Sequence, residues 1–149
     1  MDSTETISRK QHNEEIRQLK EKYKPNNAFN IPVADVLDFF KWWCVFLRPF
    51  IPLTEREIDV VARLLKQRWE LSKKIDDPSI LDTLTMSSES LSKVVEDCGM
   101  NKQHFYVVMN SLKKKGAINE RINPRLVPNM KEEGVFKLTI LFKENSQQA

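Results

Sequence analysis

SSESLSKVVEDCGMNKQHFYVVMNSLKKKGAI, residues 87–118, contains two runs of apolar residues with helical spacing. In each run the apolar side chains recur at i, i+3, i+4 and i+7, which places them on one face of an α-helix. They are Leu91, Val94, Val95 and Cys98 in the first run and Phe105, Val108, Met109 and Leu112 in the second. The pattern therefore predicts two consecutive helices, each with one buried face.

The residues between and around the two runs predict where the helices begin and end. Ser87 or Ser88 can cap the first helix and Asn101 the second, because their side-chain oxygens accept bonds from free backbone N–H groups. Gly99 and Gly116 suit the two helix ends, because glycine adopts positive φ without strain. We therefore expect a first helix up to residue 98, a turn over 99–101 and a second helix over 102–115.

The sequence after this second helix favours extended structure. Residues 121–128 contain two prolines, which is typical of a short edge strand. Residues 135–142 alternate apolar and polar side chains, as in a half-buried strand, and Gly134 precedes them. Together these segments predict a two-stranded ribbon.

The order helix, turn, helix, ribbon over residues 87–142 resembles the winged helix-turn-helix of bacterial and phage regulators. Residues 111–118, SLKKKGAI, resemble the ending of recognition helices in those families: a leucine, a charged run, a glycine and two apolar residues. The layout from Leu53 onward, with TEREIDVVA at 54–62, RWELS at 68–72 and NPRLVP at 123–128, is similar to small proteins encoded by tailed phages of gut Bacteroidetes.

The resemblance implies a mainly α fold with a small β-ribbon (α+β). We expect a winged helix-turn-helix domain at 53–143, preceded by an aromatic-rich helix at 31–50 and an N-terminal arm or frayed helix at 1–30, and followed by a disordered tail at 144–149. Within the domain, Thr54 and Glu57 have capping-box spacing, so a helix begins there. Its apolar face runs from Ile58 through Trp69 to Leu71, residues 76–79 end it, and residues 80–84 form one more helical turn.

A DNA-reading surface is the functional interpretation of the helix over 102–115. Polar, aromatic and basic side chains face away from its apolar side, and a helix in a major groove contacts base edges with its first turns. The candidate DNA contacts are Lys102, Gln103, His104, Tyr106, Val107, Asn110, Ser111, Lys113, Lys114, Lys115, Arg121 and Arg125. Residues 100–128 hold six basic residues and one acidic residue, a net charge of +5 in a chain whose total is +3. The alternative is a solvated lysine run, since the helix dipole favours cations at a carboxyl end.

The aromatic-rich segment predicts a contact with another molecule. Seven of the thirteen aromatic residues lie in the segment from Phe29 to Phe50, and five of them fall within a helix expected between Pro32 and Pro49. Its charged residues and its length argue against a membrane span. One stripe, which runs from Val33 to Leu47 along the helix, packs on the winged domain, and the neighbouring face points outward. We assign self-association to Phe39, Trp42, Trp43 and Phe46; the alternative is complete burial within one domain.

Enzyme chemistry is not expected from this sequence. It has two histidines, His12 and His104, two isolated cysteines, Cys44 and Cys98, and no phosphate-binding or metal-binding motif. We expect no catalytic residue, no cofactor and no metal, and a reducing cytoplasm as the compartment.

Two functions remain open on the sequence alone. The first is a sequence-preferring double-stranded DNA-binding regulator of transcription or replication, acting as a dimer in the cytoplasm, which is the host cytoplasm for a phage protein. The second is a phage structural, assembly or replication-complex scaffold, found in the virion or bound to a phage or host protein. Val107 favours the second, because an apolar side chain on the reading face suits a protein contact as well as a thymine methyl group.

Overall fold

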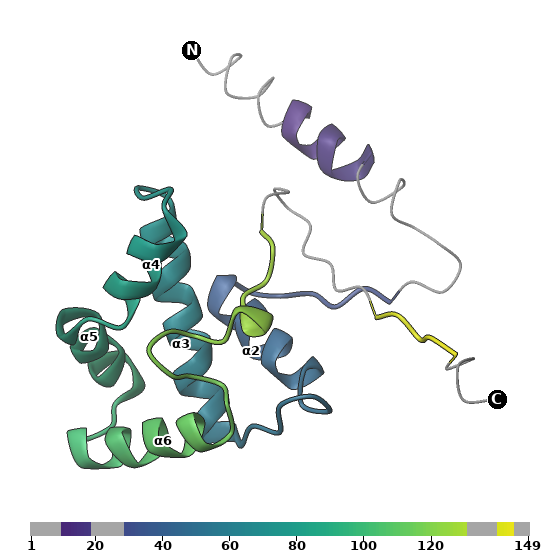
Figure 1. The fold of residues 1–149 in the computed structure, drawn as a ribbon. Helices are drawn as coiled ribbons and strands as arrows, with labels where there is room; N and C mark the ends of the chain where they lie inside the picture. Colours follow the sequence, from purple (N-terminus) through teal and green to yellow (C-terminus); the bar gives the residue numbers. More distant parts are fainter. Residues whose placement is uncertain (1–9, 19–28, 131–139, 145–149) are drawn as a thin grey trace. The chain divides into compact units, whose positions relative to one another are not determined.

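The computed structural model describes residues 10–18, 29–130 and 140–144 (Figure 1). The chain divides into two compact units, one of residues 32–128 and one formed by the two chain ends, 1–31 and 129–149. The described elements of the larger unit are α2 (Val36–Phe46), α3 (Glu55–Ser72), α4 (Pro78–Thr85), α5 (Ser88–Cys98), α6 (Lys102–Lys114) and the short 3-10 helix η1 (Pro124–Leu126).

Helix α3 is the centre of the larger unit, and it packs against α2, α4, α5 and α6. Figure 1 shows α2 and α5 on opposite sides of it. Val60, Val61, Ala62 and Leu64 are all fully buried, so α3 is enclosed on more than the one face predicted from the sequence. A helix covered from several sides needs apolar residues around most of its circumference.

The helix starts follow the capping residues predicted from the sequence. Thr54 and Glu57 form a complete capping box at the start of α3. The side chain of Ser87 accepts a bond from the backbone N–H of Ser90 at the start of α5, and Asn101 caps α6. Each cap satisfies N–H groups that have no partner inside the helix.

Two helices differ in extent from the prediction. Helix α2 begins at Val36 rather than beside Pro32, because the Asp35 carboxylate caps it by accepting the N–H of Asp38. Helix α4 spans eight residues instead of one turn, with Asp77 as its cap and Pro78 in its first turn.

The predicted β-ribbon is wrong for the residues that the structure describes, which contain helices and no strand. An isolated antiparallel bridge joins Ile118 to Ile122. Within the segment expected as an edge strand, residues 124–126 form the 3-10 helix η1. Asn123 starts this turn by accepting the backbone N–H of Arg125, and the fixed φ of Pro124 suits a helical start. Over the described residues, the mainly α fold with a β-ribbon is therefore corrected to a helical fold with no strand of the expected wing.

The second expected strand, residues 135–142, lies mostly outside the described residues. Its last three residues, 140–142, are described; they are exposed and belong to no strand. The expected tail at 144–149 is described only at Glu144, which is exposed. In the expected arm, residues 10–18 form a helix with mostly exposed side chains.

Among the described helices, none combines the length and the apolar character needed to cross a membrane.

Candidate nucleic-acid interface

Helix α6 is held by a cap at one end and by its apolar face along its length. The Asn101 Oδ1 atom accepts the backbone N–H of His104 at 2.7 Å. Gly99, at φ 67°, lets the chain turn sharply between α5 and α6. Phe105, Val108, Met109 and Leu112 are buried, as their spacing predicted. The opposite side of α6 is therefore presented to solvent in a defined orientation.

Four side chains lie directly opposite the buried face of α6. Because successive helical residues are about 100° apart, Gln103, Val107, Asn110 and Lys114 fall within about 60° of one another and about 180° from the core. All four are exposed, Val107 to 64%. We call these four residues the outer row of α6.

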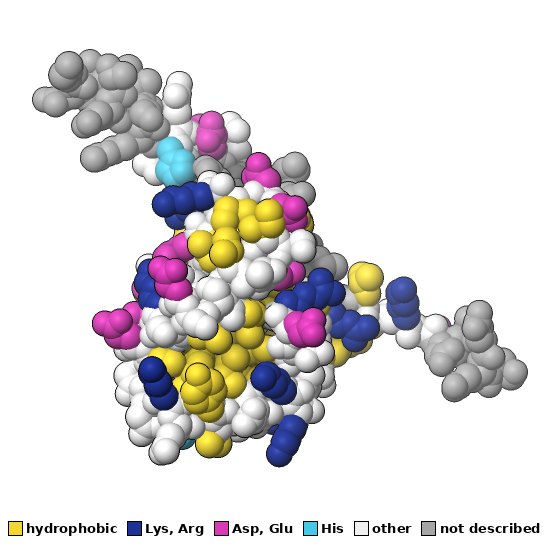
Figure 2. All heavy atoms as spheres, turned by 60° about the vertical axis from the view of Figure 1, so that its left-hand side comes forward, with side chains coloured by type: hydrophobic (Ala, Val, Ile, Leu, Met, Phe, Trp, Pro, Cys, Tyr) yellow, Lys and Arg dark blue, Asp and Glu magenta, His cyan; other side chains and the backbone are white. Residues whose placement is uncertain are grey.

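One flank of the outer row carries basic and aromatic side chains. Lys102, Tyr106 and Lys113 lie on that flank, and Tyr106 is 60% exposed. Neither of these lysines, nor Lys114, is paired with a carboxylate among the described residues, and the same holds for the exposed Arg125. Figure 2 shows hydrophobic side chains exposed in the lower part of this view, with lysine or arginine side chains on either side of them.

The other flank of α6 is used inside the fold. The Lys115 ammonium bonds to the carboxylate of Glu57 and, at 2.9 Å, to the backbone oxygen of Pro52. The Ser111 hydroxyl donates to the second oxygen of Glu57 at 2.9 Å. Two of the candidate DNA contacts thus attach the end of α6 to the start of α3, while His104, on the same flank, stays exposed.

The Glu57 carboxylate is ionised in this arrangement. Its burial by itself raises the pKa, but bonds from Lys115, the Thr54 backbone N–H and Ser111 outweigh the burial and hold the pKa of Glu57 below its ordinary value. The sequence indicated only the capping role of Glu57. Its contacts with Ser111 and Lys115 could not be predicted from local spacing, because these residues lie more than fifty positions further along the chain.

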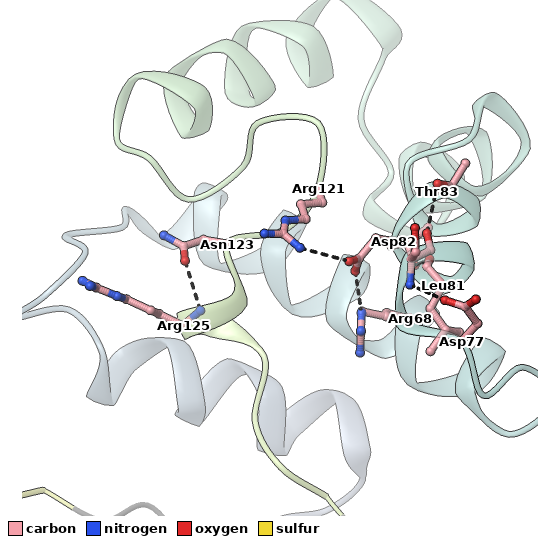
Figure 3. A network of polar contacts seen from close by, with 10 residues as sticks. Arg68, Asp77, Leu81, Asp82, Thr83, Arg121, Asn123 and Arg125 are labelled. Carbon is pink, nitrogen blue, oxygen red and sulfur yellow. Dashed lines mark hydrogen bonds and ion pairs between the residues drawn. The ribbon is translucent and has the colours of Figure 1, made fainter.

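Arg121 and Arg125, the candidate wing contacts, have different surroundings (Figure 3). Arg121 lies 3.8 Å from the Asp82 carboxylate, whose other oxygen accepts a bond from Arg68 at 3.0 Å. Arg125 extends away from this group. Arg121 is 59% exposed, so it remains accessible to a phosphate while Asp82 limits its orientations. No local pattern in the sequence indicated Asp82, since its partners come from distant segments.

The four predicted self-association residues are divided between the interior and the surface. Phe39 and Trp43 are half-buried, and the Trp43 indole N–H donates to the backbone oxygen of Leu126 at 2.7 Å. Trp42 and Phe46 are 40% and 43% exposed, with ring centroids 6.2 Å apart. Phe50, absent from the predicted set, is 70% exposed. We call Trp42, Phe46 and Phe50 the aromatic stripe.

Groups for other chemistry are sparse in the part of the chain that is described. No cluster of three or more His, Cys, Asp or Glu side chains there has the geometry to hold a metal ion. Burial raises the pKa of the Cys44 thiol to about 12. Burial, followed by the nearby Asp59 charge, raises the pKa of Cys98 to about 11. A polar hollow beside Asp82 is lined by α4 and by residues 119–121.

No protein-family model, curated protein or solved structure matches this chain. Its class is therefore described from its own geometry: a helical domain that presents one capped helix, with an amide-bearing and cationic outer face, to solvent.

Proposed function

We propose that the chain is a double-stranded DNA-binding protein that regulates transcription or replication by placing α6 in the major groove. The observation that supports this proposal is the outer row of α6, in which two amides, one aliphatic side chain and one lysine face away from the core. Amide side chains match the donor and acceptor pattern of base edges, whereas lysines contact phosphates. We place this activity in the cytoplasm, which is that of the host if the chain is phage-encoded.

The dimensions of α6 suit this role. Its 13 residues span about 20 Å, and the major groove, about 12 Å wide, admits a helix. The turn 99–101 joins α5 to α6 as in a helix-turn-helix corner.

The charge distribution places the phosphate contacts on and after α6. Helix α5 has one lysine and three acidic residues, a net charge of −2, so it is unfavourable beside a phosphate backbone. On α6 and η1, Lys102, Lys113, Lys114 and Arg125 are exposed cations with no carboxylate partner among the described residues. If these four meet phosphates, log Kobs falls with log salt with a slope of roughly −3 to −4.

The test is fluorescence anisotropy of the full chain with a mixed-sequence duplex over a range of salt concentrations. Lys114→Gln is expected to weaken binding to every sequence and to reduce the salt slope by about one. Lys74→Gln is the matched control, because Lys74 is exposed and follows the far end of α3. Salt-independent binding, or equal effects of the two variants, would contradict the proposal.

We further propose that the aromatic stripe pairs with the stripe of a second copy. From their exposed fractions, the three side chains offer about 300 Å² per protomer, whereas a stable interface buries about 800 Å² per partner. The pair is therefore weak without DNA and is strengthened when two copies occupy neighbouring half-sites.

Sedimentation velocity over a concentration series tests this pairing. Trp42→Ser combined with Phe46→Ser is expected to abolish concentration-dependent dimer formation. Ile80→Ser is the control, because Ile80 is 49% exposed on α4, outside the stripe. A monomer at all concentrations, with and without DNA, would refute self-association.

Exposure of Tyr106 and Val107 supports a second candidate function, a scaffold that binds a phage or host protein through α6. This function does not require affinity for polyanions. Absence of salt-dependent retention on heparin and on mixed-sequence DNA would favour the scaffold over DNA binding.

A further inference from the structure

The outer row of α6 has a spacing that relates it to successive base pairs. Gln103, Val107 and Asn110 are separated by four and three residues, so the row extends along the helix by about 10 Å. Base pairs in a duplex are stacked about 3.4 Å apart. The three side chains therefore cover about three base-pair steps when α6 follows the groove.

The chemistry of these three side chains favours one kind of base pair. Asn and Gln amides donate to and accept from the N6 and N7 atoms of adenine, and a valine methyl group packs against the C5-methyl group of thymine. Guanine is most often read by arginine or lysine. The outer row contains no arginine, and its one lysine, Lys114, lies at the carboxyl end, where the lysine run meets phosphates.

The side chains are available for this recognition. Gln103 and Asn110 are exposed, and neither amide has a hydrogen-bond partner among the residues that the structure describes. Val107 lies between them along the helix and is 64% exposed. Nothing in the described fold has to be displaced before these three side chains meet base edges.

We propose that α6 selects a run of three to four A·T pairs, with Gln103 and Asn110 on adenines and Val107 on a thymine methyl group. This inference rests on the proposed DNA-binding function and specifies its target. Lys102 and Lys113 flank the row and contribute binding that does not depend on sequence.

The experiment is selection of the full chain on a randomised duplex library, followed by anisotropy on the selected sequence. We expect three to four consecutive A·T pairs to be enriched. Replacing the central thymine by uracil, which removes only the C5-methyl group, weakens binding about fourfold. The same replacement has no effect on Val107→Ala.

Amide variants test the adenine contacts. Gln103→Ala and Asn110→Ala are each expected to reduce discrimination against a G·C substitution by roughly 5- to 150-fold at one position. Lys114→Ala is the matched control on the same row, because it removes a phosphate contact without adding an amide, and it weakens all sequences equally. All sites are exposed, and the circular dichroism of each variant is compared with that of the unaltered chain to confirm folding.

The outcomes separate this inference from the function on which it rests. Salt-dependent binding without enrichment, or enrichment of G·C pairs, overturns the A·T assignment and leaves DNA binding in place. Absence of binding to any duplex overturns both. Thymine-to-uracil sensitivity that persists in Val107→Ala overturns the role of Val107.

Discussion

Replacement of Glu57 by alanine is expected to destabilise the fold more than the loss of any exposed carboxylate. The Glu57 side chain is buried, with 3% of the residue exposed. It bonds to the Thr54 backbone N–H, the Ser111 hydroxyl and the Lys115 ammonium. Glu57→Ala therefore removes half of a capping box and takes away the carboxylate that accepts bonds from Ser111 and Lys115.

The expected loss of stability in Glu57→Ala can be estimated from these contacts. Loss of one member of a buried ion pair costs about 3–5 kcal/mol. Lys115 keeps 29% side-chain exposure and its bond to Pro52, so its remaining charge is partly solvated. We expect Glu57→Ala to lower the free energy of unfolding by about 2–3 kcal/mol.

Urea denaturation at pH 7, followed by circular dichroism, measures this loss. Glu55→Ala is the matched control, because Glu55 lies in the same first turn of α3 but is exposed, and its cost is at most about 0.5 kcal/mol. A double-mutant cycle with Lys115→Met should give a coupling energy of about 1 kcal/mol or more. Equal losses for Glu57→Ala and Glu55→Ala, or additive losses in the cycle, would refute the reasoning.

The contribution of Glu57 to the free energy of unfolding depends on pH, and the pKa shift gives the direction of this dependence. The pKa of Glu57 is lower in the folded chain than in the unfolded chain, so the ionised carboxylate stabilises the fold above the unfolded pKa of about 4.3. This contribution decreases as the pH falls through the folded pKa. The stability difference between the unaltered chain and Glu57→Gln is therefore constant near neutral pH and shrinks on acidification.

Three further predictions concern the turn, the indole bond and the thiols. Gly99→Ala should lower the free energy of unfolding by about 1–2 kcal/mol through backbone strain, because φ is +67° and no atom lies within 4 Å of an added Cβ; a neutral effect in urea denaturation would contradict this. Trp43→Phe should cost about 1–2 kcal/mol by leaving the Leu126 oxygen without its donor, whereas Trp42→Phe, which loses no such bond, should cost less than about 0.5 kcal/mol; equal costs would exclude the role of the indole. The Cys98 thiol, with its pKa raised to about 11, should react with iodoacetamide at pH 8 much more slowly in the folded chain than in urea, and rapid labelling of the folded chain would disprove its protection.

The candidate site was predicted in part from the sequence. Helical spacing alone identified the buried residues of α6 and hence its exposed face, including Gln103, Val107 and Asn110, because an α-helix has a fixed angle per residue. The same pattern did not distinguish lysines that face solvent from Lys115, whose partner Glu57 lies in another helix.

The principal difference from the sequence-based prediction is the two-stranded ribbon expected from residues 121–128 and 135–142. Apolar alternation describes which face of an isolated segment is suited to burial, but a strand requires a partner at hydrogen-bonding distance. At residues 123–126, the Asn-Pro pair favours a turn by its own stereochemistry. Leu126 is fully buried there. Its backbone oxygen accepts a hydrogen bond from the Trp43 indole N–H instead of from the backbone of a neighbouring strand.

The sequence by itself determined where most helices begin and end, because caps, glycines and apolar periodicity act within a few residues of one another. Thr54, Asn101 and Gly99 are examples, and each occupies its expected place. Only the tertiary structure decided how polar groups are paired, as in the contacts of Glu57 with Lys115 and of Asp82 with Arg121. Such pairs join segments far apart in the chain, and their distances depend on how α3 packs against the helices around it.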